Sequence, residues 1–174
     1  EFVDAVKGGT IPGQFMPAVE KGVREALTAG VIAGYPVVDV QVTVYDGKYH
    51  TVDSKEIAFV TAARKAVIAA ILEAKPIVLE PIVDVEISAP EAATGDITGD
   101  LSSRRAQVAG TDAQMAGLML VKAKAPLAEL TGYQTRLNAL TSGQGRFSLT
   151  LSHFEPVPPN VQNQLTSGHQ LKDD

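Results

Sequence analysis

Along residues 82–154, hydrophobic residues recur first with the two-residue period of a strand and then with the 3.6-residue period of a helix, and the two patterns follow each other in a definite order. That order restricts the fold of this part of the chain. Valine and isoleucine at 83, 85 and 87 alternate with polar residues at 84, 86 and 88, which is typical of a strand with one buried face. The elements predicted after this strand are a helix over 93–105, a short strand over 107–110, a longer strand over 115–125, a helix over 127–141 and a strand over 147–154. The order βαββαβ predicts a ferredoxin-like domain.

The first half of the chain predicts a strand, a helix, a second strand and a second helix. Residues 1–6 are typical of a strand, and a helix is expected from about Pro17 to Gly30, a residue type that commonly caps helix C-termini. Valines at 38, 40, 42 and 44 alternate with polar residues, which indicates the second strand. From Ser54 to about Ala74 most residues are strong helix formers, so we expect the second helix there.

Two prolines separate these halves. Pro76 and Pro81 cannot continue a helix and favour an extended connector. We therefore predict an α+β chain of two small α/β-sandwich domains, the first over 1–76 and the second over 77–156. The Pro-, Asn- and Gln-rich residues 157–174 are expected to form a docked or frayed tail.

The residues between the second strand and the second helix predict a polar tip. Asp46-Gly47 is typical of a tight, hairpin-like reversal, and it is followed by Lys48, Tyr49 and His50. Asp53 and Glu56 have the spacing of a capping box, with Asp in the Ser/Thr role, so that the helix start would hold the tip from its other side.

Composition excludes several classes of function. The chain has 45% hydrophobic residues, a formal net charge of −5 and a pI near 5.2. A disordered chain is excluded by the apolar fraction, and a general polyanion binder is disfavoured by the acidic balance, so any RNA contact must be local. With no cysteine, the chain has no disulfide, thiol catalyst or Cys-based zinc site. Its most apolar helical run, 66–72, is far shorter than the roughly 20 residues of a membrane span.

The chemistry of individual residues leaves alternatives open. His50 and Asp53 could form a base and its orienting group or half of a metal site, but a solvated loop residue and a helix cap are favoured. Lys48, Tyr49 and His50 could contact RNA, or could be an ordinary polar loop.

Arg104-Arg105 would suit a phosphate, although favourable charge at a helix C-terminus explains the pair better. The acids Glu80 and Asp84, and Asp96 and Asp100, are expected on solvated faces. Neither Gly-x-x-x-x-Gly-Lys-Ser/Thr nor Gly-x-Gly-x-x-Gly occurs, so the glycine pairs are expected in turns.

Several motifs in a shared order resemble one known family, bacterial elongation factor G, the translocation GTPase. The resemblance covers most of domain IV and all of domain V and runs nearly end to end. The motifs are Lys7-Gly-Gly-Thr-Ile-Pro-Gly, Pro17-Ala-Val-Glu-Lys-Gly, Ala33-Gly-Tyr-Pro-Val-Val-Asp, Tyr49-His-Thr-Val-Asp-Ser-Lys-Glu, Lys75-Pro-Ile-Val-Leu-Glu-Pro, Thr94-Gly-Asp-Ile-Thr-Gly-Asp-Leu-Ser-Ser-Arg-Arg and Leu130-Thr-Gly-Tyr.

The resemblance implies a non-catalytic, ribosome-binding arm. In that family the tip of domain IV enters the decoding-site side of the small subunit and holds the tRNA–mRNA duplex, while domain V lies near the GTPase-associated RNA of the large subunit. It implies an incomplete ribosomal-protein-S5-domain-2-like βαβα unit in the first half, whose first strands lie upstream of Glu1. Ribosome or RNA contacts are implied for Gly47, Lys48, Tyr49, His50, Asp53, Arg104 and Arg105.

The resemblance also implies that GTP and Mg belong to upstream GTPase domains of a longer parent chain. This chain itself is expected to need no cofactor or metal, to be cytoplasmic and monomeric, and to bind no membrane. Three features are more similar to elongation-factor-G-like paralogues: the tip sequence Val44-Tyr-Asp-Gly-Lys-Tyr-His, Ala106 after the arginines, and the acidic balance. Roles in ribosome recycling, in stress or in ribosome protection therefore stay open. A ferredoxin-like regulatory module is the second alternative. An acylphosphatase-like enzyme ranks last, because 90–95 lack the required arginine.

Overall fold

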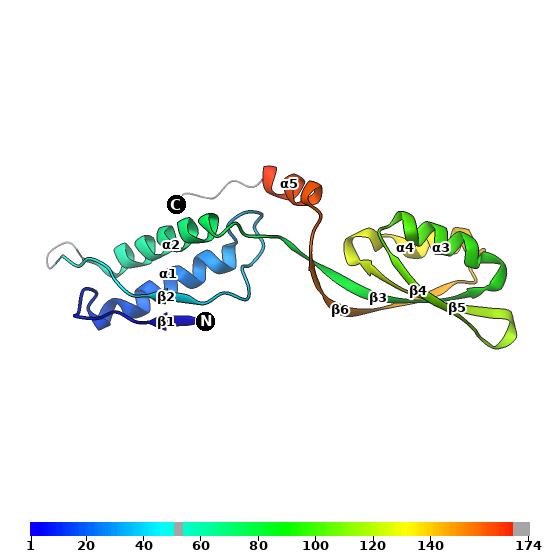
Figure 1. The fold of residues 1–174 in the computed structure, drawn as a ribbon, viewed down its shortest axis with the longest axis horizontal. Helices are drawn as coiled ribbons and strands as arrows, with labels where there is room; N and C mark the ends of the chain where they lie inside the picture. The colour runs from blue at the N-terminus through cyan, green and yellow to red at the C-terminus, as the bar shows by residue number, and fades with distance from the viewer. Residues whose placement is uncertain (51–53, 169–174) are drawn as a thin grey trace. The chain divides into compact units, whose positions relative to one another are not determined.

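The computed structural model describes residues 1–50 and 54–168 and divides into two compact units (Figure 1). Unit 1 comprises residues 1–78 and the described residues from Pro158 on, and unit 2 comprises Leu79–Val157. Within the described residues, no helix is both long and apolar enough to cross a membrane.

Unit 1 is a βαβα arrangement, followed at the far end of the chain by one more helix. Its elements are β1 (Phe2–Asp4), the 3-10 turn η1 (Gly13–Phe15), α1 (Met16–Ala29), β2 (Val42–Val44), α2 (Glu56–Glu73) and α5 (Pro159–Ser167). β1 and β2 pair in parallel, with Phe2 opposite Val42 and Asp4 opposite Val44. The predicted element order is therefore confirmed for this half of the chain.

The two long helices of unit 1 pack closely against each other. α1 begins with a proline in its first turn and ends at Gly30, whose φ of 78° is readily adopted only by glycine. At Gly22 a Cβ atom would lie 2.2 Å from the backbone oxygen of Val60 on α2, so only glycine permits this approach. Side chains from both helices and both strands share two apolar clusters, which contain Phe2, Ile11, Phe15, Ala18, Val19, Val23, Ala26, Val42, Val44, Phe59 and Val67.

Unit 2 has the predicted ferredoxin-like topology. Its elements are β3 (Leu79–Pro90), η2 (Glu91–Ala93), α3 (Thr94–Ser103), β4 (Gln107–Ala113), η3 (Met115–Gly117), β5 (Leu118–Pro126), η4 (Leu127–Leu130), α4 (Tyr133–Thr141) and β6 (Arg146–Pro156). The strands form an antiparallel sheet in the order β4-β5-β3-β6, with α3 and α4 on one face (Figure 1).

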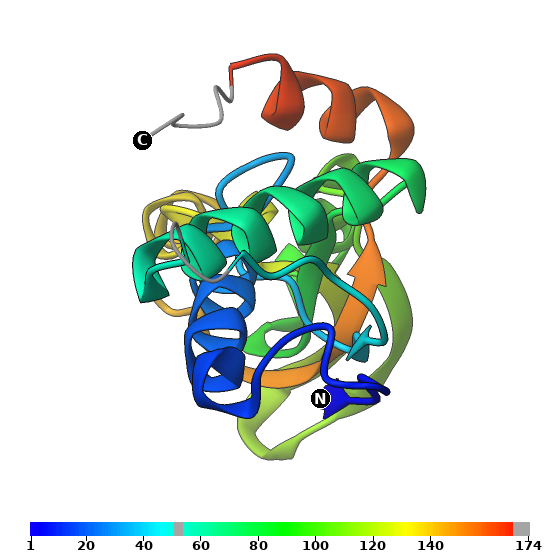
Figure 2. The same cartoon turned by 90° about the vertical axis from the view of Figure 1, so that its left-hand side faces the viewer.

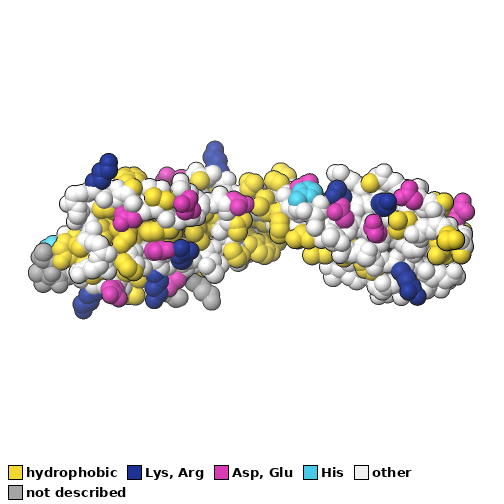
Figure 3. Space-filling view, turned by 90° about the horizontal axis from the view of Figure 1, so that it is seen from below, with side chains coloured by type: hydrophobic (Ala, Val, Ile, Leu, Met, Phe, Trp, Pro, Cys, Tyr) yellow, Lys and Arg dark blue, Asp and Glu magenta, His cyan; other side chains and the backbone are white. Residues whose placement is uncertain are grey.

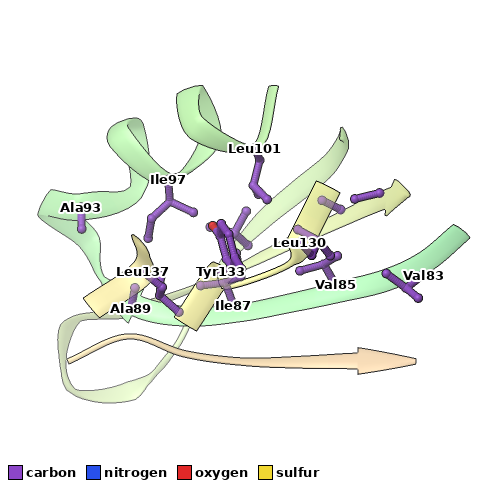
Figure 4. Packing of buried hydrophobic residues seen from close by; sticks show 13 residues of the cluster. Val83, Val85, Ile87, Ala89, Ala93, Ile97, Leu101, Leu130, Tyr133 and Leu137 are labelled. Carbon is purple, nitrogen blue, oxygen red and sulfur yellow. The ribbon is translucent and has the colours of Figure 1, made fainter. Parts of the chain in front are cut away.

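The core of unit 2 lies between this sheet and its two helices (Figure 4). Val85 and Ile87 of β3 face it, as the alternation predicts, and Ile87, Ile97, Leu101 and Leu137 are completely buried. Tyr133 lies among these side chains with 1% of its surface exposed, and its ring meets Phe147 edge-on at 5.3 Å.

Two elements are shorter than the sequence predicts. The strand expected over 38–44 is confined to Val42–Val44, because Asp39 adopts a φ of 58° that breaks the extended conformation. The strand expected from Met115 begins at Leu118, because Ala116 and Gly117 take left-handed conformations and form the turn after β4.

The helix predicted over 127–141 is interrupted. Leu127–Leu130 form a 3-10 turn, and α4 starts only at Tyr133, after Gly132 with a φ of 71°. The regular spacing of leucine and tyrosine does not reveal this interruption, because Leu130, Tyr133 and Leu137 are buried in the interrupted arrangement too.

The residues after Pro156, expected as a docked or frayed tail, include a docked helix. α5 begins with a proline in its first turn and is attached to the segment before β3. The Gln162 side chain accepts a hydrogen bond from the Val78 N–H at 3.1 Å and donates one to the Pro76 carbonyl at 3.4 Å.

Candidate functional site

One end of unit 1 collects two loops and two helix starts. β1 and β2 are parallel, so both strands end at this side, and α1 and α2 both begin there (Figures 1 and 2). One loop joins β1 to α1, and the other joins β2 to α2. We call residues 45–50 of the second loop the tip.

The tip is not a hairpin turn. β2 is followed by a helix rather than by an antiparallel strand, and Gly47 is not among the residues with positive φ. Asp46 instead accepts a hydrogen bond from the Gly47 N–H at 2.7 Å. A Cβ at position 47 would lie 2.5 Å from Cδ1 of Ile11, so the glycine provides space for the neighbouring loop.

The end of the tip is held by Ser54 among the described residues. The His50 N–H donates to Ser54 Oγ at 3.0 Å, and α2 begins at Glu56 after Lys55, whose side chain makes no capping bond. Ser54 therefore lies outside the helix that was predicted to start there. The predicted capping role and RNA contact of Asp53 fall on 51–53, outside the described residues.

Three aromatic rings connect the tip to the core of unit 1. Phe59 of α2 stacks on Phe15 with centroids 4.5 Å apart and an interplanar angle of 18°. Tyr49 lies against the same Phe15 at 5.8 Å and 37°. Since both phenylalanines are buried and Tyr49 is 38% exposed, the tip carries one aromatic surface open to solvent on a packed support.

The polar side chains of the tip are accessible. Lys48 and His50 are exposed, and both flank Tyr49 in sequence. Sequence reasoning missed the support from Ile11 and Phe15, although both are apolar residues in a run otherwise rich in glycine and proline. On the face drawn in Figure 3, basic side chains are interspersed with acidic ones and form no continuous basic patch.

Arg104 of unit 2 is engaged within its own unit. Its guanidinium donates to Asp100 Oδ2 at 2.8 Å and to the Glu129 carbonyl at 2.7 Å, and it lies 5.3 Å from the centre of the Tyr133 ring. Only 25% of its side chain is exposed. These contacts join the end of α3 to η4 and the start of α4.

Arg105 is also paired internally. It adopts a φ of 60° and forms two hydrogen bonds with the carboxylate of Glu80, and it lies 3.5 Å from a carboxylate oxygen of Glu129. The hydrogen bonding to Glu80 raises the pKa of Arg105 above its ordinary value. Neither arginine is presented as an unpaired cation, and both belong to a different unit from the tip.

Three of the acids expected on solvated faces are paired, and two of them, Glu80 and Asp100, are shielded from solvent, whereas Asp84 is exposed as expected. Glu80 is 8% exposed, and its carboxylate is bound by Arg105. Asp84 pairs with Lys124 across β3 and β5 at 2.5 Å. The Asp100 carboxylate accepts hydrogen bonds from Arg104 and Arg136. Burial alone would raise the pKa of Asp100, but these hydrogen bonds outweigh burial and hold the pKa below its ordinary value.

The exposed side chains of the tip are suited to noncovalent contacts. Among residues 1–50 and 54–168, no group of three His, Asp or Glu side chains could hold a metal ion. The tip presents an aromatic face on Tyr49 and an exposed lysine next to it in the sequence, a combination found in proteins that bind unpaired nucleotides.

Comparison with known families matches both halves of the chain in succession. Residues 1–75 match the model described as elongation factor G, domain IV, and residues 77–165 match the model described as elongation factor G C-terminus. The chain belongs to the elongation factor G family. The resemblance noted from the sequence motifs is therefore confirmed.

Relatives from the elongation factor G family span the chain nearly end to end. The chain is 47% identical over 165 residues to an elongation factor G-like protein of Thermotoga maritima and equally to an elongation factor G of Aquifex pyrophilus. A crystal structure of a protein from Thermus thermophilus superposes with a TM-score of 0.79 at 39% identity, over 95% of this chain and 25% of that one. Each match to the curated relatives covers 95% of this chain but only about 24% of the length of the relative.

Proposed function

We propose that this chain is a ribosome-binding arm of an elongation factor G-type translational GTPase. The consecutive match to domain IV and to the C-terminal domain carries the proposal. We assign residues 1–76 to a domain IV-like part and 77–156 to a domain V-like part. In this proposal, the tip contacts RNA of the decoding site and the tRNA–mRNA duplex, and unit 2 contacts the GTPase centre of the large subunit.

The proposed mechanism is steric and electrostatic. Tyr49 is supported by the buried rings of Phe15 and Phe59, so the tip would keep its form when it meets RNA. Lys48 would contact phosphate, Tyr49 would offer a stacking surface, and His50 would donate or accept a hydrogen bond. GTP and Mg would be bound by the upstream domains of the parent chain, because this sequence contains no phosphate-binding Gly-x-x-x-x-Gly-Lys-Ser/Thr motif.

Arg104 and Arg105 take a narrower role in this proposal. Their internal pairs support the fold of unit 2, and only their exposed fractions, 25% and 35% of each side chain, would be available to large-subunit RNA. Any contribution to ribosome binding is therefore expected to be smaller than that of the tip.

Sedimentation with purified ribosomes tests the proposal. The chain should co-sediment with ribosomes, and the double variant Lys48→Gln/His50→Gln should bind more weakly. Lys65→Gln, which removes an exposed lysine from the middle of α2, is the matched control and should bind like the wild type. Absence of co-sedimentation, or equal binding by all three proteins, would contradict the proposal.

Translocation and recycling are both compatible with the comparisons, because identity to the elongation factor G and to the elongation factor G-like relative is the same. The variant His50→Ala in the parent chain distinguishes the two roles. Reduced tRNA–mRNA movement with normal subunit splitting would favour translocation. Reduced subunit splitting with normal tRNA–mRNA movement would favour recycling.

A further inference from the structure

We propose that Tyr45 is a stacking platform for an unpaired nucleobase, so that the tip binds bases as well as phosphates. This inference deepens the proposed function and rests on it. Tyr45 was not among the residues predicted to contact RNA.

The exposure of Tyr45 is the first observation. It is 77% exposed, against 38% for Tyr49 and 1% for Tyr133. Val42 and Val44 of β2 contribute to the core clusters while Thr43 is exposed, so Tyr45 continues the side of the strand that faces away from the helices. Packing within unit 1 therefore does not account for this ring.

The neighbours of Tyr45 match the chemistry of single-stranded RNA. One carboxylate oxygen of Asp46 accepts a hydrogen bond from the Gly47 N–H, and Lys48 is exposed three residues after the ring. Tyr49 lies four residues after Tyr45, a stretch of chain that spans at most about 14 Å. Two exposed tyrosine surfaces and a lysine thus belong to one short loop, a composition suited to bases on a charged backbone.

The net charge of the chain favours stacking over phosphate neutralisation. A formal charge of −5 gives little sequence-independent affinity for a polyanion. Stacking of one base on an aromatic side chain contributes about 1–3 kcal/mol and requires no surplus of positive charge. An acidic chain that binds RNA locally would therefore depend on rings such as Tyr45.

Fluorine NMR of the chain labelled with 3-fluorotyrosine tests the inference. The sequence contains four tyrosines, so each resonance can be assigned by one Tyr→Phe variant. The probes are a short oligoadenylate RNA and a ribose–phosphate strand of the same length without bases. The Tyr45 resonance should shift with the RNA but not with the abasic strand, and the buried Tyr133 should respond to neither.

Affinity for the same oligoadenylate provides the second measurement. Tyr45→Ala should weaken binding about 5- to 150-fold, whereas Tyr45→Phe should keep wild-type affinity because the ring remains. Tyr35→Ala is the matched control, since Tyr35 is 56% exposed in the loop before β2 and should not affect binding.

Equal affinity for the two strands, equal binding by Tyr45→Ala and Tyr35→Ala, or no binding of oligoadenylate by the wild type would each overturn the stacking inference. Ribosome co-sedimentation by the wild-type chain would then still support the proposed function. Failure to co-sediment would instead overturn the proposed function.

Discussion

Arg105 and Glu80 form a bidentate ion pair that joins the end of α3 to the start of β3. Arg105 Nη1 donates to Glu80 Oε2 at 3.2 Å, and Nη2 donates to the other carboxylate oxygen. The Glu80 side chain is only 10% exposed, so its charge depends on this partner. The same arginine that resembles a ribosome contact in sequence is therefore a structural group of unit 2.

Removing Arg105 should destabilise unit 2. Arg105→Ala leaves Glu80 shielded without its bidentate partner, and we expect a loss of about 1–3 kcal/mol, less than for a fully buried pair because Arg105 is partly exposed. Native-state amide hydrogen exchange of β3 and β5 measures the change. Arg146→Ala, at an exposed arginine of β6, should change stability by less than about 0.5 kcal/mol.

The ion pairs of Asp100 predict a loss of stability in acid. Burial alone would raise the pKa of Asp100, but hydrogen bonds from Arg104 and Arg136 hold it below its ordinary value of 3.8. A depressed carboxyl pKa stabilises the fold above 3.8, and this stabilisation is lost as pH falls through the lower, folded-state pKa. Unfolding measured against pH should show a smaller acid-dependent loss in Asp100→Asn than in the wild type. Identical profiles would show that Asp100 does not contribute.

The raised pKa of Tyr133 predicts a loss of folding stability at high pH. Burial, with a smaller contribution from Asp100, raises its pKa from 10 to about 12. Between these values the unfolded state loses the phenol proton and the folded state keeps it, so stability should fall by on the order of 2–3 kcal/mol.

Tyr133→Phe provides the comparison for this alkaline loss. It should show a smaller decrease, and at neutral pH it should be at least as stable as the wild type, because the hydroxyl has no hydrogen-bond partner among the described residues. A Tyr133→Phe profile parallel to that of the wild type through pH 10–12 would disprove the assignment.

Gly22 and Gly99 should respond oppositely to alanine. In Gly22→Ala the new methyl group would overlap the Val60 carbonyl, so α1 and α2 would have to separate at a cost of about 1–3 kcal/mol. Gly99 lies within α3, where a Cβ meets no atom within 4 Å, and Gly99→Ala should stabilise unit 2 by about 0.5–1 kcal/mol. Thermal unfolding should show a lower melting temperature for Gly22→Ala and a higher one for Gly99→Ala than for the wild type.

Elements with strong periodicity could be predicted from the sequence. α1, α2 and β3 agree with expectation to within a few residues, except that β3 also includes Pro81 and begins at Leu79. The predicted bounds are wrong where the backbone conformation of a single residue ends or interrupts a helix or strand. Asp39, Ala116 and Gly132 have positive φ values, which hydrophobic spacing does not reveal.

The composition of the tip could be predicted, but its support could not. Asp46-Gly47 suggested a hairpin because that dipeptide is common in such turns, whereas the glycine here makes room for Ile11. The ion pair between Glu80 and Arg105 joins residues 25 positions apart, and only the register of β3 and the end of α3 bring them together.

Directed hydroxyl-radical probing tests the central claim most directly. The chain contains no cysteine, so Lys55→Cys, in the loop of the tip, and Arg146→Cys, in unit 2, each provide one exposed site for tethered Fe(II) without removing a proposed RNA contact of the tip. Bound to ribosomes, the probe at 55 should cleave small-subunit RNA at the decoding site, and the probe at 146 should cleave large-subunit RNA near the GTPase centre. Cleavage no greater than that of the cysteine-free chain, or the same cleavage pattern from both positions, would contradict the proposed arm.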